Sequence, residues 1–569
     1  MLTKLTVRNF KLFNEVVLEL GERVVLIGPN NAGKTSALQA LALWDIGVKR
    51  WSEKRGAGNV PAQRPGVTVN RRDLITVPVP TANHLWRDLH TQESRRGNGT
   101  QKIYIDIIVD GIAANQTWRC GLEFYYANEE SFYCRSLRLP DGGRMDVPHE
   151  ATGLHIAYLP PMSGLSANET RLDEGAINVR LGEGRTAEVL RNLCYQVLQG
   201  EQGVAKWGQL AGRMEALFGI RLDEPEYIKE RGEIVMSYRT RGDIQLDISS
   251  SGRGQQQTLL LLAHMTANPG SVLLLDEPDA HLEILRQRQI YEILTNTAAQ
   301  TGSQIIAASH SEVILNEAAD RDIVIAFVGR PHRIDDRGSQ VMKALKEIGF
   351  EHYVQAEETG LVLYLEGSTD LAILRAFANH LNHPATAALE RPFVQYVGNQ
   401  TRKAQDHFYG LREAKSDLVG LGIFDRLEQQ LPVDPNLRLV TWRRRELENY
   451  LCTRATLLAY AETKGRTEQG ELFGQSWREA MQEAITEIEA ALAALGKASP
   501  WSTEIKSSDD FLDPVFKKFY EKLGLPNLMS KTDFHALASF VPPNEIDAEV
   551  REKLDMIAEV AAQARPRQE

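Results

Sequence analysis

The residues best suited to chemistry begin at Gly28, where GPNNAGKT satisfies the pattern G-x-x-x-x-G-K-[ST]. Glycines let backbone N–H groups wrap around phosphates, Lys34 supplies a cation, and the Thr35 hydroxyl is a magnesium ligand. A glycine-rich turn that merely caps a helix is the alternative, and it is disfavoured because every fixed position is matched. We therefore predict that these residues bind the phosphates of ATP: Gly28, Pro29, Asn30, Asn31, Ala32, Gly33, Lys34, Thr35 and Ser36.

A second group of candidates follows the apolar run VLLLDEP, in which Asp276 and Glu277 stand at the end of a predicted strand. Asp276 is placed to hold magnesium through water, and Glu277 to polarise the attacking water. Two acids after a strand are usually a loop or a helix cap. Here S-G-x-G-Q lies just upstream, formed by Ser251, Gly252, Gly254 and Gln255, and this order favours a catalytic role.

The C-terminal half carries acids after successive predicted strands. LVLYLEGSTD places Glu366 at a strand end and Asp370 in the first turn of the next helix, and LVGLGIF ends at Asp425. Magnesium takes hard oxygen ligands, so carboxylates gathered at strand ends suit it. For the first of these motifs, a helix cap at Ser368 or Thr369 is an equally good interpretation. The remaining candidate metal ligands are Glu428, Glu446 and Glu448.

The elements that must position these residues are strands that run into loops. We predict strand, turn and strand over residues 2–26, then an apolar helix, and parallel strands over 271–276 and 304–308. Residues 51–98 are rich in Gly, Pro and Arg and predict a long loop or insertion. Helices are predicted over 186–219 and, from the alanine-rich spacing, over 479–495.

Bulk composition sets limits on the function. With 569 residues and 43% apolar content, the chain can build two or three domains. A net charge of −11 means that any nucleic-acid contact must be local, for example at the arginines 443–445. The four scattered cysteines predict neither zinc nor disulfides, and no apolar run approaches a membrane span. We expect a cytoplasmic protein without membrane contact.

In its first half the chain resembles the ABC-ATPase superfamily. The resemblance rests on three motifs that follow one another in the family's order: the phosphate loop, the S-G-x-G-Q segment and the acidic strand end. In that family the signature of one subunit lies on the γ-phosphate held by another, so the resemblance implies a homodimer or higher homo-oligomer. It also implies that His310 is the switch histidine and that residues 280–283 form a dimer contact. A histidine at a strand end is otherwise usually a surface or capping residue.

The order of acids in the second half resembles the TOPRIM domain. An ABC-ATPase followed by TOPRIM is the layout of the overcoming-lysogenization-defect (OLD) nucleases, a family that includes the Gabija defence endonuclease. The ELENYL segment is typical of that family, and Lys531 matches its late catalytic lysine. One departure stands out: the family has Asp-x-Asp where this chain has Asp425, Arg426 and Leu427, unless Glu428 substitutes.

The resemblance implies an α/β fold with an ABC-ATPase head, a helical dimerisation insertion and a TOPRIM domain. The expected boundaries are 1–165 for ATPase lobe I, 166–245 for the insertion, 246–350 for lobe II, and 351–569 for TOPRIM with its own helical insertion. The implied function is an ATP-regulated nuclease of antiviral defence that uses ATP and Mg²⁺ or Mn²⁺. DNA is a better expected substrate than RNA, and a defence partner protein is also possible. The alternatives are a repair-type or sensor ATPase that binds nucleic acid or a partner without cutting, and an ATPase that drives a separate effector while the TOPRIM part cuts RNA.

Overall fold

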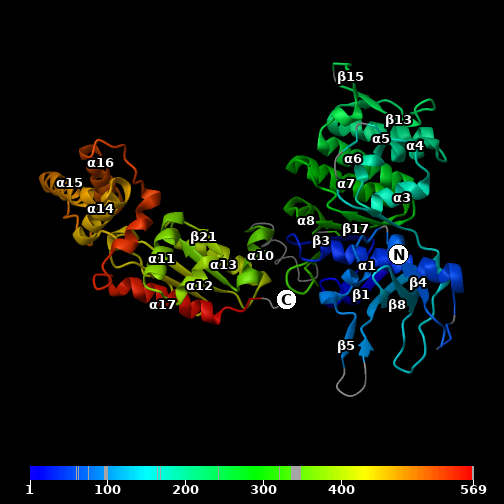
Figure 1. The fold of residues 1–569 in the computed structure, drawn as a ribbon, viewed down its shortest axis with the longest axis horizontal. Coiled ribbons are helices and arrows are strands. Elements are labelled where there is room, and N and C mark those ends of the chain that lie inside the picture. The colour runs from blue at the N-terminus through cyan, green and yellow to red at the C-terminus, as the bar shows by residue number, and fades with distance from the viewer. Residues whose placement is uncertain are drawn as a thin grey trace. The chain divides into compact units, whose positions relative to one another are not determined.

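The computed structural model describes the whole chain except residues 59, 62, 75, 95–99, 163–164, 167, 241, 320, 335–347 and 567–569. It forms two compact units, residues 1–342 and 343–568 (Figure 1). The predicted boundary between residues 350 and 351 falls at the start of helix α10 (Phe350–Thr359) in the second unit. None of the helices in the described parts of the chain is long and apolar enough to cross a membrane.

The first unit begins with a six-stranded sheet in the order β2-β1-β7-β8-β9-β4, in which every strand pairs antiparallel with its neighbours. Its strands are β1 (Leu2–Phe10), β2 (Phe13–Glu19), β4 (Val67–Asn70), β7 (Ile105–Ala113), β8 (Gln116–Asn128) and β9 (Ser131–Ser136). Apolar and polar residues alternate along these strands, so one face is buried, as expected for antiparallel pairing. That face packs on helix α1 (Lys34–Arg55).

Helix α1 corrects one expectation from the sequence. The loop predicted from residue 51 starts later, because α1 continues to Arg55 and Trp51 on it is 1% exposed. A buried tryptophan stabilises the last turns of the helix more than the following glycines and prolines disrupt them. The chain then forms short elements: η1 (Arg71–Asp73), η2 (Ala82–Leu85), η3 (Arg87–Leu89), β5 (Gln92–Ser94) and β6 (Thr100–Lys102).

A second sheet in this unit has the order β10-β16-β17-β3-β18-β19, parallel except for the last pair. Its strands are β3 (Arg23–Ile27), β10 (Ile156–Leu159), β16 (Val272–Asp276), β17 (Gln304–Ser309), β18 (Ile323–Ala326) and β19 (His332–Arg333). The predicted strands β16 and β17 are confirmed, and both are buried along their whole length. The carboxyl ends of β3, β16 and β17 therefore meet at one edge.

Helices lie on both sides of the parallel sheet: α1 on one side and the group around α6 and α7 on the other (Figure 1). The insertion expected to be helical has helices only in its first part, and it ends in short strands. The elements of the insertion are α3 (Glu174–Gly182), η4 (Thr186–Glu188), α4 (Leu190–Gln199), α5 (Gly203–Phe218), β11 (Arg221–Leu222), β12 (Glu226–Ile228), β13 (Glu233–Val235), β14 (Ser237–Arg239) and β15 (Gln245–Asp247). Helix α2 (His149–Thr152) precedes the insertion, and η5 (Ile248–Ser250), α6 (Arg253–Ala267), α7 (Ile284–Thr301) and α8 (Glu312–Ala318) follow it.

The second unit has a fully parallel sheet in the order β21-β20-β22-β23. Its strands are β20 (Leu361–Leu365), β21 (Val394–Tyr396), β22 (Val419–Phe424) and β23 (Leu437–Thr441). Helices accompany it, as parallel connections require: α10, α11 (Ser368–His380), α12 (Ala385–Glu390), α13 (Thr401–Ala414) and α17 (Ala548–Gln563). The strand and helix predicted around Glu366 are both present.

The remaining residues of this unit form a helical group, with α14, α15 and α16 clustered beyond the sheet in Figure 1. Its elements are η7 (Leu447–Tyr450), α14 (Arg454–Gln469), η8 (Glu471–Phe473), α15 (Gly474–Ala494), the π-helical turn η9 (Ser508–Leu512), α16 (Asp513–Lys522) and η10 (Lys531–Phe540). The alanine-rich helix predicted over 479–495 is confirmed as part of α15.

Candidate functional site

The phosphate loop connects the end of β3 to the start of α1. Gly33 has φ 100°, which favours glycine, and a Cβ on Gly28 would stand 2.6 Å from the carbonyl oxygen of Phe327. The Lys34 ammonium donates to the Gly28 and Pro29 carbonyls, each at 2.7 Å. Burial lowers the pKa of Lys34, while Glu277, Asp276 and Asp279 raise it. The lysine therefore lies inside the loop that the sequence assigned to phosphate.

The loop and the acidic strand end are in direct contact. The Thr35 hydroxyl donates to Asp276 Oδ1 at 3.1 Å, and the Tyr158 hydroxyl donates to Asp276 Oδ2 at 3.3 Å. Burial raises the pKa of the Asp276 carboxyl, and the neighbouring Glu277 charge raises it further. The two residues predicted to share a magnesium ion therefore share a hydrogen bond. Tyr158 was missed because it lies within an ordinary apolar strand.

Glu277 and His310 face each other from the ends of neighbouring strands. Glu277 follows β16, His310 follows β17, and His310 Nδ1 lies 3.7 Å from Glu277 Oε1. Both side chains are partly exposed, with relative accessibilities of 33% and 51%. The pair is therefore open to a ligand at the same sheet edge as Lys34.

The S-G-x-G-Q segment forms the start of helix α6. Ser251 is buried and donates to the Ile248 carbonyl, whereas Gly252 is exposed and its N–H donates to Gln255 Oε1 at 3.3 Å. A Cβ on Gly254 would stand 3.0 Å from the His281 carbonyl oxygen, so the segment contacts the 280–283 loop of its own chain. The structure places these residues together at an accessible helix N-terminus.

In the second unit, Glu366 and Asp425 follow the adjacent strands β20 and β22. Asn399, which follows β21, connects them: its Nδ2 donates to Glu366 Oε2 at 2.9 Å, and its Oδ1 accepts from the Asp425 N–H at 3.1 Å. The Asp370 Oδ2 accepts from the N–H groups of Glu366 and Gly367. The helix cap expected at Ser368 or Thr369 is wrong, because α11 begins at Ser368 after Gly367 and the Asp370 carboxylate accepts from the Gly367 N–H. Asp370 also lies beside Glu366, and its role as a metal ligand stays a prediction.

Four carboxylates influence one another at this sheet edge. Burial raises the pKa of Asp425 well above its usual range, and a hydrogen bond with Glu366 and the charges of Glu366, Asp370 and Glu448 raise it further. Burial, then Glu446, raises the pKa of Glu448 to about 8, and burial, then Glu366, raises that of Asp370 to about 6. We name Glu366, Asp370, Asp425 and Glu448 the carboxylate cluster.

Three further predicted residues of this half, Glu446, Glu428 and Lys531, are not members of the carboxylate cluster, and each has different contacts. Glu446 is 3% exposed and its carboxylate accepts from the N–H and hydroxyl of Ser508. Glu428 is exposed, acts on Arg426, and is not among the carboxylates that act on Asp425. Lys531 pairs with Asp509, next to Ser508 in sequence.

The donor set of the carboxylate cluster is chemically suited to a hard divalent cation. Within the described residues, however, no three His, Cys, Asp or Glu side chains converge on one point as the ligands of an ion do. The carboxylates are electrostatic neighbours, and their repulsion is the property that a cation would relieve.

Comparisons with known proteins bear on the first unit. Residues 1–44 match the family model "AAA ATPase domain", and residues 213–316 match the model "AAA domain, putative AbiEii toxin, Type IV TA system". The first segment contains the phosphate loop, and the second contains the S-G-x-G-Q segment, Asp276, Glu277 and His310. Together with the contact between Thr35 and Asp276, these matches make the first unit an ATPase domain of the P-loop class.

Similar curated proteins include ones named "Putative peptide import ATP-binding protein" from Brucella abortus (strain 2308) and Brucella suis biovar 1 (strain 1330). Each is 32% identical over 78 residues, which is 14% of this chain and 23% of the relative. The chain thus spans less than a quarter of the length of these relatives.

Among solved structures, an SMC head bound to the C-winged helix domain of ScpA aligns at 13% identity and TM-score 0.34, over 58% of this chain and 97% of that one. The SMC head domain from Thermotoga maritima aligns at 15% identity and TM-score 0.29, over 58% and 98%. At these scores the similarity establishes neither fold nor function.

Proposed function

We propose that this chain is an ATP-regulated, metal-dependent nuclease of the OLD type, with the second unit as its TOPRIM domain. The observation that supports the nuclease most is the carboxylate cluster, because two residues that follow the adjacent parallel strands β20 and β22, with Asp370 of α11 and Glu448 of η7, act on one another. Such an arrangement suits a cation that binds a phosphodiester. Antiviral defence, with DNA as the substrate, is the role that the family resemblance favours.

The first unit supplies the ATP-dependent part of the proposal. Lys34 and the phosphate loop would hold the phosphates of ATP, Thr35 and Asp276 would hold magnesium, and Glu277, beside His310, would orient the attacking water. The exposed α6 N-terminus, with Gly252 and Gln255, completes the site of a second copy of the chain in a homodimer. We propose that ATP binding changes the population of conformations competent for cleavage.

In the second unit the residues of the carboxylate cluster would bind a divalent cation and so orient the scissile phosphate. A bound Mg²⁺ or Mn²⁺ supplies charge neutralisation of the scissile phosphate and activation of water. Glu366, Asp425 and Glu448 would hold this cation once it draws them together, Asp370 and Asn399 fix the positions of Glu366 and Asp425 by hydrogen bonds, and Lys531 would contact the nucleic acid.

A second candidate function has one observation in its favour. Leu427 stands where the family has a second aspartate, and the exposed Glu428 is not among the charges that act on Asp425. A site that lacks this ligand favours a repair-type or sensor ATPase, in which the second unit binds nucleic acid or a partner protein without cutting.

The two functions are separated by incubating the purified full chain with supercoiled DNA and with tRNA, with Mg²⁺ or Mn²⁺, with and without ATP. We expect metal-dependent cutting of DNA, abolished by Glu366→Ala and by Asp425→Ala with ATP hydrolysis nearly unchanged. Glu428→Ala is the matched control, because this acid lies outside the cluster, and we expect it to cut normally. A parent that cuts neither substrate in any condition, or cluster variants that cut as well as the parent, would establish the sensor ATPase instead.

A further inference from the structure

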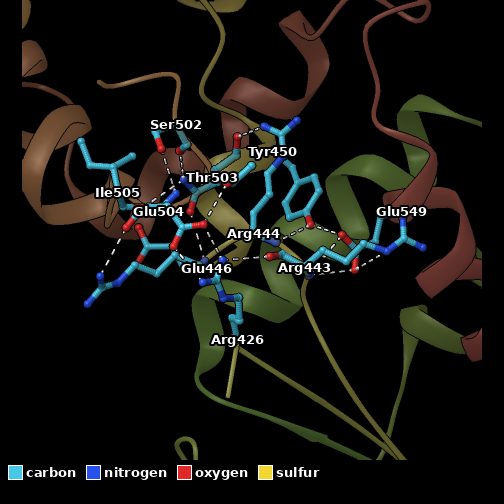
Figure 2. Close-up of polar contacts among 12 residues, drawn as sticks. Arg426, Arg443, Arg444, Glu446, Tyr450, Ser502, Thr503, Glu504, Ile505 and Glu549 are labelled. Carbon is cyan, nitrogen blue, oxygen red and sulfur yellow. Dashed lines mark hydrogen bonds and ion pairs between the residues drawn. The ribbon is translucent and has the colours of Figure 1, made fainter. Parts of the chain in front are cut away.

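Arg426, directly after Asp425, is held by an acid from a distant part of the sequence. Its Nη1 and Nη2 donate to Glu504 Oε1 and Oε2, both at 2.7 Å, in a two-pronged ion pair (Figure 2). Glu504 belongs to the loop between α15 and η9. The guanidinium that stands nearest in sequence to the carboxylate cluster is thus neutralised by a carboxylate of the helical group.

The loop that carries Glu504 is fixed to the strand-end segment by contacts that do not involve Arg426. The Arg445 N–H donates to the Thr503 carbonyl at 3.0 Å, and Asn449 Nδ2 donates to the Ile505 carbonyl at 3.1 Å. Asn449 is 2% exposed, so this anchor is buried. The loop therefore keeps its place whether or not Glu504 contacts Arg426.

The pair itself is exposed, unlike its anchor. The Arg426 and Glu504 side chains have relative accessibilities of 43% and 57%. Exposed ion pairs contribute little to stability and exchange readily with other partners. A guanidinium binds a phosphate with the same two-pronged geometry with which it binds a carboxylate.

We propose that Arg426 is a phosphate-binding residue for DNA and that Glu504 occupies its guanidinium until a backbone phosphate displaces it. The inference rests on the proposed function, which supplies DNA as the substrate. It adds Arg426 as a specific phosphate contact beside the carboxylate cluster and Glu504 as the group that competes for this contact. Arg443 and Arg444 are paired with Glu552 and Asp547, from α17 and the residue before it. Arg426 is distinguished from them by its place next to Asp425.

The test measures binding without cleavage. A fluorescein-labelled 30-base-pair DNA duplex is titrated with the full chain in EDTA and without nucleotide, and anisotropy gives Kd at several salt concentrations. We expect Arg426→Ala to weaken binding about three- to tenfold and to lower the salt slope by about 0.9, the value for one lost phosphate contact. We expect Glu504→Gln to tighten binding about two- to fivefold, since a weak competing ion pair is lost.

The double variant tests competition directly. If Glu504 acts through Arg426, Glu504→Gln tightens binding much less in the Arg426→Ala background than in the parent. Glu559→Gln is the matched control: Glu559 pairs with Arg438 at 3.0 Å, both side chains are exposed, and Arg438 lies on β23 away from its carboxyl end. Two results would overturn the proposal, because each would show simple charge repulsion between an acid and DNA. One is that Glu504→Gln and Glu559→Gln tighten DNA binding equally. The other is that Glu504→Gln tightens DNA binding equally in the parent and in Arg426→Ala.

Cleavage is assayed separately, with Mg²⁺ or Mn²⁺, so that the two proposals fail in different ways. Binding that changes as expected in a parent that never cuts DNA supports the role of Arg426 and overturns the nuclease. Cutting by a parent whose DNA affinity does not respond to Arg426→Ala overturns the role of Arg426 alone. A parent that neither binds DNA in EDTA nor cuts it with metal overturns both.

Discussion

Asp106 provides a test of how charge is arranged in the antiparallel sheet that packs on α1. In β7 it lies opposite Glu123 of β8 and Arg8 of β1. Glu123 already binds Arg135 and Arg144. Burial and, after it, the charge of Glu123 raise the pKa of Asp106 to about 6 against the opposing effect of Arg8. Compared with the unfolded chain, the folded protein thus favours the neutral form of the Asp106 side chain.

The magnitude follows from linkage between protonation and folding. The gap between an ordinary pKa of 3.8 and a folded pKa of about 6 corresponds to at most about 3 kcal/mol of lost stability at high pH. Asp106→Asn removes this loss but also the attraction to Arg8, so we expect a net stabilisation of about 1–2 kcal/mol at pH 8.

The sign of the pH dependence is fixed by the raised pKa. The favourable contribution of neutral Asp106 is present below pH 3.8 and is lost as the pH rises through about 6. The advantage of Asp106→Asn should therefore grow over this range, reach about half its full size near pH 5, and stay constant above about pH 7.

Urea unfolding followed by tryptophan fluorescence at pH 5 and pH 8 measures the effect. Asp110→Asn is the matched control, because Asp110 lies on the same strand but pairs with Arg119 at 3.1 Å. We expect no stabilisation from that change. The reasoning is refuted if Asp106→Asn leaves the parent's stability at pH 8 unchanged, or if Asp110→Asn stabilises equally.

Three further expectations concern the nucleotide site and the helical group. Lys34→Ala should weaken ATP binding at least tenfold in calorimetry without unfolding the protein, since the side chain serves the ligand; an unchanged Kd would reject this. Glu277→Gln should retain ATP but hydrolyse it more than tenfold more slowly, and parent ATPase should need an assembled dimer; a strictly monomeric form that is equally active would contradict it. Asn449→Ala should destabilise the second unit by about 2–3 kcal/mol in thermal unfolding, because buried carbonyls lose their donor, whereas a loss below about 0.5 kcal/mol would contradict that anchor.

The sequence predicted the elements that begin or end at the candidate residues because these signals are local. Apolar runs that end in acids gave β16, β20 and β22, and the spacing after Glu366 gave α11. Once strands are parallel and adjacent, their carboxyl ends share an edge, so the proximity of Glu366 and Asp425 also followed.

The residues that hold the site together were not predictable in the same way. Tyr158 contacts Asp276 across neighbouring strands, and Asn449 contacts a loop more than fifty residues later, so their roles depend on tertiary packing. Asn399 is the exception: it follows β21, and the rule used for the acids would have found a polar residue at that strand end. The end of α1 was missed because burial of Trp51 outweighs local propensity.

The two sheet edges differ in how they balance negative charge, and this difference indicates where a divalent cation matters more. In the first unit Lys34 is close enough to Asp276, Glu277 and Asp279 for each to raise its pKa. In the second unit no ion pair within the described residues involves any member of the carboxylate cluster, and Arg426, which follows Asp425 in sequence, is paired with Glu504. Mutual repulsion there is relieved by protonation or by a cation. Divalent cations should therefore stabilise the second unit against unfolding in the parent and much less in Asp425→Asn.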